Sequence, residues 1–404
     1  MEAIGTALHG VMAAVWAALY YCTWLFLGDC RVKLVAAAAS DKKRNCVRAL
    51  VEAHCPSLAD PKKARYVPTP YLIGGMLQTV YCAYIALRRD KKSNIKYERE
   101  LRTMRDGGTV SLDWYPGRID DAKSTQPIVI VLSGLGGSSY EYHIRCLAKH
   151  LAVTTDGGMR VVVANHRGCG RTPLTSSQLY NGHDTSDLTE VIAHVSKMFP
   201  CAPLACIGFS LGSNLVMRYL GEAGDRTPLA AAVGVCCPFD TVTTGHMMNK
   251  PGFLNDNLFQ PALMRTLKRT VSRNLDMIRS GNVEYDIDAI MRAKRMSEID
   301  NAITAKAYGF KDCWEYYAAV SPIDSVDSIR RPFLAINTHD DPITPVAGVP
   351  LDKFESNPHT AAAIVDYGGH LGFFTGIPAR IWFLDPVAEF LAAALAESGD
   401  SPPC

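Results

Sequence analysis

Residues 208–212 read Gly-Phe-Ser-Leu-Gly, and this pentapeptide constrains the fold more than any other part of the chain. It follows the apolar run 204–207, which is typical of a buried parallel strand, and it precedes a segment with a helical pattern. A serine on so tight a strand-to-helix turn needs glycine on both sides, because side chains there would clash with neighbouring backbone. The pattern predicts an exposed, nucleophilic Ser210, and an ordinary glycine turn is the alternative.

Short apolar runs alternate with helix-length segments from residue 127 onward. This alternation predicts a mostly parallel central sheet flanked by helices on both faces. The expected strands are 127–132, 160–165, 204–209, 230–236, 332–337 and 361–366. Residues 97–115 add a hairpin around the turn Asp106-Gly107-Gly108.

Residues 238–325 interrupt the alternation with a long, mostly helical pattern. We expect a helical cap inserted over the carboxyl edge of the sheet, where open α/β sheets bind ligands. Its basic run at 268–273 is either a solvated helix face or a contact for lipid headgroups. The core then comprises 97–237 and 326–404, preceded by a helical, lid-associated segment at 46–96.

The N-terminal segment 10–28 contains no charged residue and is long enough to cross a bilayer as a helix. We therefore expect residues 1–45 to form an N-terminal transmembrane helix, the membrane anchor, with a basic flank. A signal peptide and a buried core helix are the alternatives. A signal peptide normally has a basic start, however, and the only charged side chain before this segment is that of Glu2. Basic residues follow the segment, and the positive-inside rule would keep the next domain in the cytosol.

Two loops downstream of Ser210 supply the partners that a serine nucleophile requires, a carboxylate and a histidine base in that chain order. The strand 332–337 ends in a turn with Asp340 and Asp341, and we prefer Asp341 as the acid, with Asp340 as turn former or helper. The strand 361–366 leads into two glycines and His370, the expected base.

An oxyanion hole needs two backbone N–H groups directed at the developing negative charge. Leu211, directly after the nucleophile, is one expected donor. Leu135, in the glycine-serine loop 133–139 after the first core strand, is the other. A merely flexible glycine-serine turn is the alternative for this loop.

With these residues, the chain resembles the YheT-like branch of the α/β-hydrolase domain-containing family, the AB hydrolase 4 family. The resemblance runs from about residue 54 to 395 and rests on Pro68-Thr69-Pro70, Leu77-Gln78-Thr79, Asp106-Gly107-Gly108, Asp113-Trp114, Leu135-Gly136-Gly137-Ser138-Ser139, Asn165-His166-Arg167-Gly168-Cys169-Gly170, Gly208-Phe209-Ser210-Leu211-Gly212, Asp340-Asp341-Pro342 and Gly368-Gly369-His370-Leu371-Gly372-Phe373. It implies an α/β-hydrolase fold. It also implies a medium-chain or phospholipid ester as substrate and a single-pass location in the endoplasmic reticulum or another endomembrane. Membrane-anchored relatives are usually assigned the opposite orientation to the one that the charges favour, so the side of the catalytic domain stays open.

Some relatives carry a His-x4-Asp motif proposed for acyl transfer, and no histidine here has an acidic residue five positions on; His183 is followed by Asp187, one residue too close. The sequence therefore favours a serine esterase or lipase over an acyltransferase or a non-catalytic binding protein. We expect no metal and no organic cofactor, because the triad needs neither and the thirteen cysteines have no metal-ligand spacing. The net charge of +2 argues against nucleic acid, so the expected partners are an ester substrate and a membrane. The oligomeric state stays open.

Overall fold

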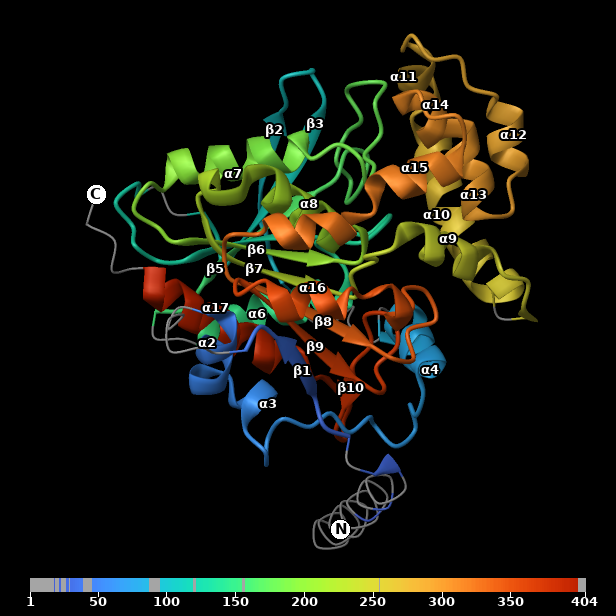
Figure 1. The fold of residues 1–404 in the computed structure, drawn as a ribbon. Coiled ribbons are helices and arrows are strands. Elements are labelled where there is room, and N and C mark those ends of the chain that lie inside the picture. Colours follow the sequence, from blue (N-terminus) through green and yellow to red (C-terminus); the bar gives the residue numbers. More distant parts are fainter. Residues whose placement is uncertain are drawn as a thin grey trace, which may run out of the picture.

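The computed structural model describes residues 18, 22, 27, 28, 30–38, 46–86, 95–118, 121–154, 157–253 and 255–398. Its centre is a nine-stranded sheet (Figure 1) in the order β1 (Lys33–Ala36), β9 (Thr360–Val365), β8 (Phe333–Thr338), β7 (Leu229–Val235), β6 (Leu204–Phe209), β4 (Ile128–Leu132), β5 (Arg160–Asn165), β3 (Thr109–Tyr115) and β2 (Glu98–Thr103). The six strands from β9 to β5 are mutually parallel, and β1, β3 and β2 pair antiparallel. The six predicted core strands and the hairpin are confirmed, and the bounds of the core strands shift by at most one residue.

Helices cover both faces of the sheet (Figure 1) because alternate strand residues point to opposite sides. In β4, Val129 and Val131 belong to one apolar cluster, whereas Ile130 belongs to the other. The first cluster packs under α2 (Val47–His54), α3 (Pro56–Ala59), α6 (Tyr142–Thr154) and α17 (Leu384–Ser398). The second packs under α7 (Ser186–Met198), α8 (Leu211–Ala223) and α16 (Leu351–Ser356).

The N-terminal part differs from our expectation at one point. Lys33–Ala36, which we assigned to the basic flank of the anchor, is the edge strand β1, antiparallel to β9. Most of the predicted anchor at 10–28 lies outside the described residues. Within the part that the structure describes, no helix combines the length and the apolar character needed to cross a membrane.

The segment between β7 and β8 forms a layer of short helices beyond the ends of the strands, at the upper right of Figure 1. Its helices are α9 (Thr241–Asn249), α10 (Gln260–Arg273), α11 (Leu275–Arg279), α12 (Ile287–Arg292), α13 (Met296–Ile299), α14 (Ala305–Tyr308) and α15 (Cys313–Val320). This layer, called the cap below, has an apolar cluster of its own that includes Met264, Val271 and Ile290.

Helix α4 (Gly75–Val80) continues into a π-helical turn, Tyr81–Ala86. Gln78 and Thr79 are buried against the loop that follows β9. Gln78 accepts from the amide of Phe374 at 2.7 Å through its side-chain oxygen. The segment therefore packs beside the carboxyl edge of the sheet.

Candidate active site

Ser210 lies on the turn between β6 and α8 with φ 51° and ψ −116°, a conformation that L-residues rarely adopt. A Cβ added to Gly208 would lie 2.3 Å from the carbonyl oxygen of Gly212, and one on Gly212 would lie 2.6 Å from that of Leu132. Both glycines are therefore required for the turn, as the sequence predicts.

The three side chains expected to form a triad lie in one hydrogen-bonded line. Nε2 of His370 is 2.9 Å from Oγ of Ser210, and Nδ1 of His370 is 2.9 Å from Oδ2 of Asp341. Since Asp341 accepts at Nδ1, the neutral imidazole carries its proton there and leaves Nε2 free to take the proton of the serine. The loops after β6, β8 and β9 bring these residues together.

The Asp341 carboxylate is fully enclosed and well supplied with donors. Oδ1 accepts from the amides of Ile343 and Thr344 at 2.8 and 2.9 Å, and Oδ2 accepts from the Thr344 hydroxyl at 2.5 Å. Burial alone would raise the pKa of Asp341, but the charge of His370 and these hydrogen bonds hold that pKa below its usual value. Asp341 therefore stays ionised beside the histidine.

Asp340, the alternative acid, has a different set of partners. Its Oδ1 accepts from the Thr338 hydroxyl at 2.6 Å and from the amide of Gly369 at 2.9 Å. Burial raises the pKa of Asp340. The residue ties the turn after β8 to the loop that carries His370, which corresponds to the helper role.

The loop around His370 is pressed against α4. A Cβ on Gly369 would lie 2.0 Å from the carbonyl oxygen of Gly75, and Gly369 has φ +60°, so only glycine fits there. The amide of His370 donates to the hydroxyl of Thr79 at 2.8 Å. Helix α4 thus holds the backbone of the histidine in place.

Leu135 and Leu211, the predicted oxyanion donors, line the same cavity as Ser210 and His370. Neither backbone N–H donates to an acceptor within the described part of the chain. A Cβ on Gly134 would lie 3.2 Å from Cβ of Ser210, which shows how closely the loop after β4 approaches the serine. Two uncommitted N–H groups beside a serine are what an oxyanion hole requires.

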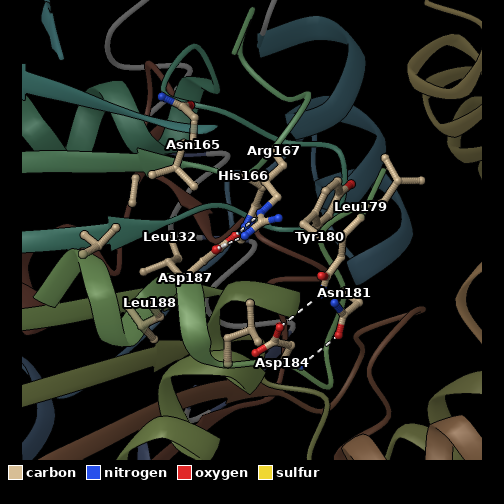
Figure 2. Close-up of a pocket in the computed structure, with 15 residues that line it drawn as sticks. Leu132, Asn165, His166, Arg167, Leu179, Tyr180, Asn181, Asp184, Asp187 and Leu188 are labelled. Carbon is tan, nitrogen blue, oxygen red and sulfur yellow. Dashed lines mark hydrogen bonds and ion pairs between the residues drawn. The ribbon is translucent and has the colours of Figure 1, made fainter. Parts of the chain in front are cut away.

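Two aromatic residues beyond β5, His166 and Tyr180, lie beside each other in Figure 2 and support this loop. Nε2–H of His166 donates to the carbonyl of Ser133 at 3.2 Å, and the hydroxyl of Tyr180 accepts from the amide of Gly136 at 2.8 Å. Their rings stack with centroids 4.8 Å apart and 13° between their planes. The oxyanion loop is therefore held from behind at two backbone positions.

Another buried histidine, His143 of α6, lines the cavity near His370. Burial, with a smaller effect of the His370 charge, lowers the pKa of His143 to about 3. Its ring packs edge-on against Phe209, with centroids 4.7 Å apart. His143 is neutral at physiological pH and forms no hydrogen bond with Ser210 among the described residues, so His370 is the base that the geometry provides.

A cavity of about 580 Å³ extends from Ser210 into the cap. Its core side holds Ser210, His370, Leu135 and Leu211, and Thr79 and Cys82 form part of the α4 side. Apolar side chains dominate the cap side, among them Met248, Leu263, Leu267, Val271, Ile299 and Ile303. The volume and the lining suit an apolar chain attached to a polar reacting group.

The donors of Cys236, Asp341 and His370 all lie within 4.8 Å of one another, close enough to be considered as a metal site. The histidine and the aspartate are engaged with each other and with Ser210, and burial raises the pKa of the Cys236 thiol far above its usual value. This set therefore belongs to the serine site.

Sequence reasoning did not single out Thr79, Tyr180 or His143 as site residues. Thr79 lies within one of the motifs that carry the family resemblance, Leu77-Gln78-Thr79, and that was a usable signal. Nothing local distinguishes Tyr180 or His143, because their partners are distant in sequence.

Comparisons with known proteins point to the same fold. A family model described as alpha/beta hydrolase fold matches residues 127–377. The human phospholipase ABHD3 is 32% identical over 350 residues, which are 86% of this chain and 82% of that protein. Two proteins of Saccharomyces cerevisiae are also similar. The monoacylglycerol lipase is 28% identical, and the match covers 88% of this chain and 87% of the lipase. Medium-chain fatty acid ethyl ester synthase/esterase 2 is 30% identical, and the match covers 81% of this chain and 87% of that protein.

The matched family model covers more than half of the chain and includes the six parallel strands, the turn at Ser210 and the loops with Asp341 and His370. The chain therefore belongs to the α/β-hydrolase fold family.

Proposed function

We propose that this protein is a membrane-anchored serine hydrolase that cleaves carboxylic esters of lipids through a Ser210–His370–Asp341 triad. The observation that carries the proposal is the hydrogen-bonded line from Asp341 through His370 to Ser210, ending in a mostly apolar cavity. The relatives named as a phospholipase and a monoacylglycerol lipase support an ester of a lipid as the substrate.

In the first half of the reaction, His370 takes the hydroxyl proton of Ser210 through Nε2 while Oγ attacks the ester carbonyl carbon. The N–H groups of Leu135 and Leu211 bind the oxyanion that forms, and Asp341 stabilises the imidazolium. Collapse of this intermediate breaks the bond to the alkoxy oxygen, which receives the proton from His370 and leaves as an alcohol.

In the second half, His370 removes a proton from water, whose oxygen attacks the acyl-enzyme. The carboxylic acid leaves, and Oγ of Ser210 regains its proton. The cap cavity excludes bulk water from most of the acyl chain, which is why we assign its apolar lining to that chain.

The test is labelling with a fluorophosphonate probe, which reacts with an activated serine. Wild type is expected to be labelled and Ser210→Ala is not, while Ser356→Ala, at an exposed serine of α16, serves as the matched control. Circular dichroism checks that all three proteins fold. Undiminished labelling of Ser210→Ala contradicts the proposed nucleophile, and a wild type that does not react favours a non-catalytic binding protein.

Transfer of the acyl group to an alcohol is the second candidate, because one relative is named as both an ethyl ester synthase and an esterase. Water and an alcohol compete for the same acyl-enzyme. Product analysis of an octanoyl ester, with and without added ethanol, separates the two. Mostly octanoic acid supports hydrolysis, whereas ethyl octanoate as the main product supports transfer.

Membrane anchoring rests on the uncharged segment 10–28 and on the basic residues that follow it. We propose a single pass in the endoplasmic reticulum or another endomembrane. A chain lacking residues 1–28 retains β1, which begins at Lys33. In carbonate extraction of cell membranes, the full chain is expected in the pellet and the truncated chain in the supernatant. Release of both argues against the anchor.

A further inference from the structure

Two acids that the proposed reaction does not use, Glu141 and Asp300, line the cavity above Ser210. Asp300 lines the cavity from the cap side and is 3% exposed. Its carboxylate accepts from the Thr304 hydroxyl at 2.8 Å and from the Tyr317 hydroxyl at 2.7 Å. Both donors are neutral, and no cationic side chain among the described residues forms an ion pair with Asp300.

Four tyrosines line the same cavity as this acid, and one of them donates to it. They are Tyr180, Tyr308, Tyr316 and the donor Tyr317. The hydroxyls of Tyr180 and Tyr316 already accept from the amides of Gly136 and Gly182, at 2.8 and 2.9 Å. The polar tips of these two rings are therefore occupied by the protein, and the rings themselves remain as cavity surface.

An ionised carboxylate in an apolar cavity is unfavourable unless a cation pairs with it. Burial raises the pKa of Asp300 to about 6, against the hydrogen bonds from Tyr317 and Thr304, which lower it. The acid is thus ionised at neutral pH, and within the described residues it forms no ion pair, although Arg265 lines the same cavity. Aromatic faces attract ammonium groups as well, because the ring quadrupole is negative there.

We propose that Asp300 and the tyrosines around it bind an ammonium group of the ester substrate. This inference rests on the proposed ester hydrolysis, since the ammonium group is placed in the cavity that ends at Ser210. The competing explanation is that Asp300 only cross-links Thr304 to Tyr317 within the cap.

The test compares two esters of the same shape, octanoylcholine and 3,3-dimethylbutyl octanoate, which differ by one positive charge. Wild type is expected to prefer octanoylcholine in kcat/KM by about tenfold or more, through KM. Asp300→Asn is expected to bring the ratio close to one while it leaves kcat/KM for the neutral ester within about twofold. Asp288→Asn, at an exposed acid of α12, is the matched control and is expected to keep the wild-type ratio.

If wild type shows no preference for octanoylcholine in kcat/KM, the proposal is overturned, and this measurement needs no variant. An unchanged preference in Asp300→Asn also overturns it and leaves the cross-linking role. Binding of octanoylcholine to Ser210→Ala, measured by thermal shift with and without Asp300→Asn, separates the two proposals. If binding depends on Asp300 but wild type cleaves neither ester, the cation site stands and the hydrolase function fails.

Discussion

The backbone N–H of His370 donates to the hydroxyl of Thr79 at 2.8 Å, and that hydroxyl donates to the carbonyl of Gly75 at 2.7 Å. The two residues are 291 positions apart in the chain. Through this contact helix α4 fixes the loop that carries the base. Thr79 touches no reacting atom, so its contribution is to position His370.

Replacing Thr79 by valine keeps the shape of the side chain but removes the acceptor for the His370 amide. Loss of one such hydrogen bond corresponds to about 1 kcal/mol, so we expect kcat for a soluble p-nitrophenyl ester to fall roughly fivefold with little change in KM. Thr79→Ser keeps the hydroxyl and is expected to restore kcat. If Thr79→Val has the wild-type kcat, the histidine loop does not depend on this contact.

Replacing each of the two neighbouring aspartates by asparagine is expected to have very different effects on kcat. Asp341→Asn removes the charge beside His370 and disturbs its tautomer, so we expect kcat to fall by about 10³-fold or more. Asp340→Asn changes a carboxylate that bonds to Thr338 and Gly369, and its effect on kcat is expected to be far smaller. Steady-state kinetics on both variants checks this, and the reverse order would move the acid to Asp340.

The central sheet could be predicted from the sequence because its strands are buried on both faces and read as continuous apolar runs between helical segments. The turn at Ser210 could be predicted because only glycine fits at 208 and 212. The loops with Asp341 and His370 could be ordered because each follows a recognisable strand.

Other features had no local signal. β1 is four residues long and is stabilised by pairing with β9, more than 300 residues away, so its sequence alone looked like the flank of an anchor. Tyr180 and Thr79 each accept a hydrogen bond from a backbone amide on a loop distant in sequence. Asp300 is one acid in a helical segment, and only the folded cap places it on the wall of the cavity.

Tyr180→Phe tests whether the oxyanion loop depends on its support from behind. The variant keeps the ring that stacks on His166 but leaves the Gly136 amide without its acceptor. We expect kcat to fall about threefold to tenfold, less than the 10²–10³-fold typical for loss of an oxyanion donor itself. His166→Phe, which frees the Ser133 carbonyl, is expected to act in the same direction. Unchanged kcat in both variants would mean that the loop keeps its conformation unaided.

The pH dependence of stability provides a separate test of Asp300. Its pKa is about 6 in the folded protein, above the value of about 3.8 expected when unfolded. Below pH 4 the acid is protonated in both states. Between pH 4 and 6 the folded state holds a proton that the unfolded state has lost, so the stability of wild type relative to Asp300→Asn falls as the pH rises through 6. Over the whole interval the difference changes by about 3 kcal/mol, of which about 2 kcal/mol falls between pH 4.5 and pH 8.

The titratable groups whose charges interact with Asp300 do not change their protonation over this pH interval. Burial raises the pKa of Tyr180, Tyr316 and Tyr317, and it raises that of Cys313 to about 11, so none of them titrates below pH 8. Urea unfolding of wild type and Asp300→Asn at pH 4.5 and pH 8 measures the difference, with Asp288→Asn as the control. A difference that does not change with pH would show that Asp300 is not an ionised buried acid, and the charge proposed to bind an ammonium group would then be absent.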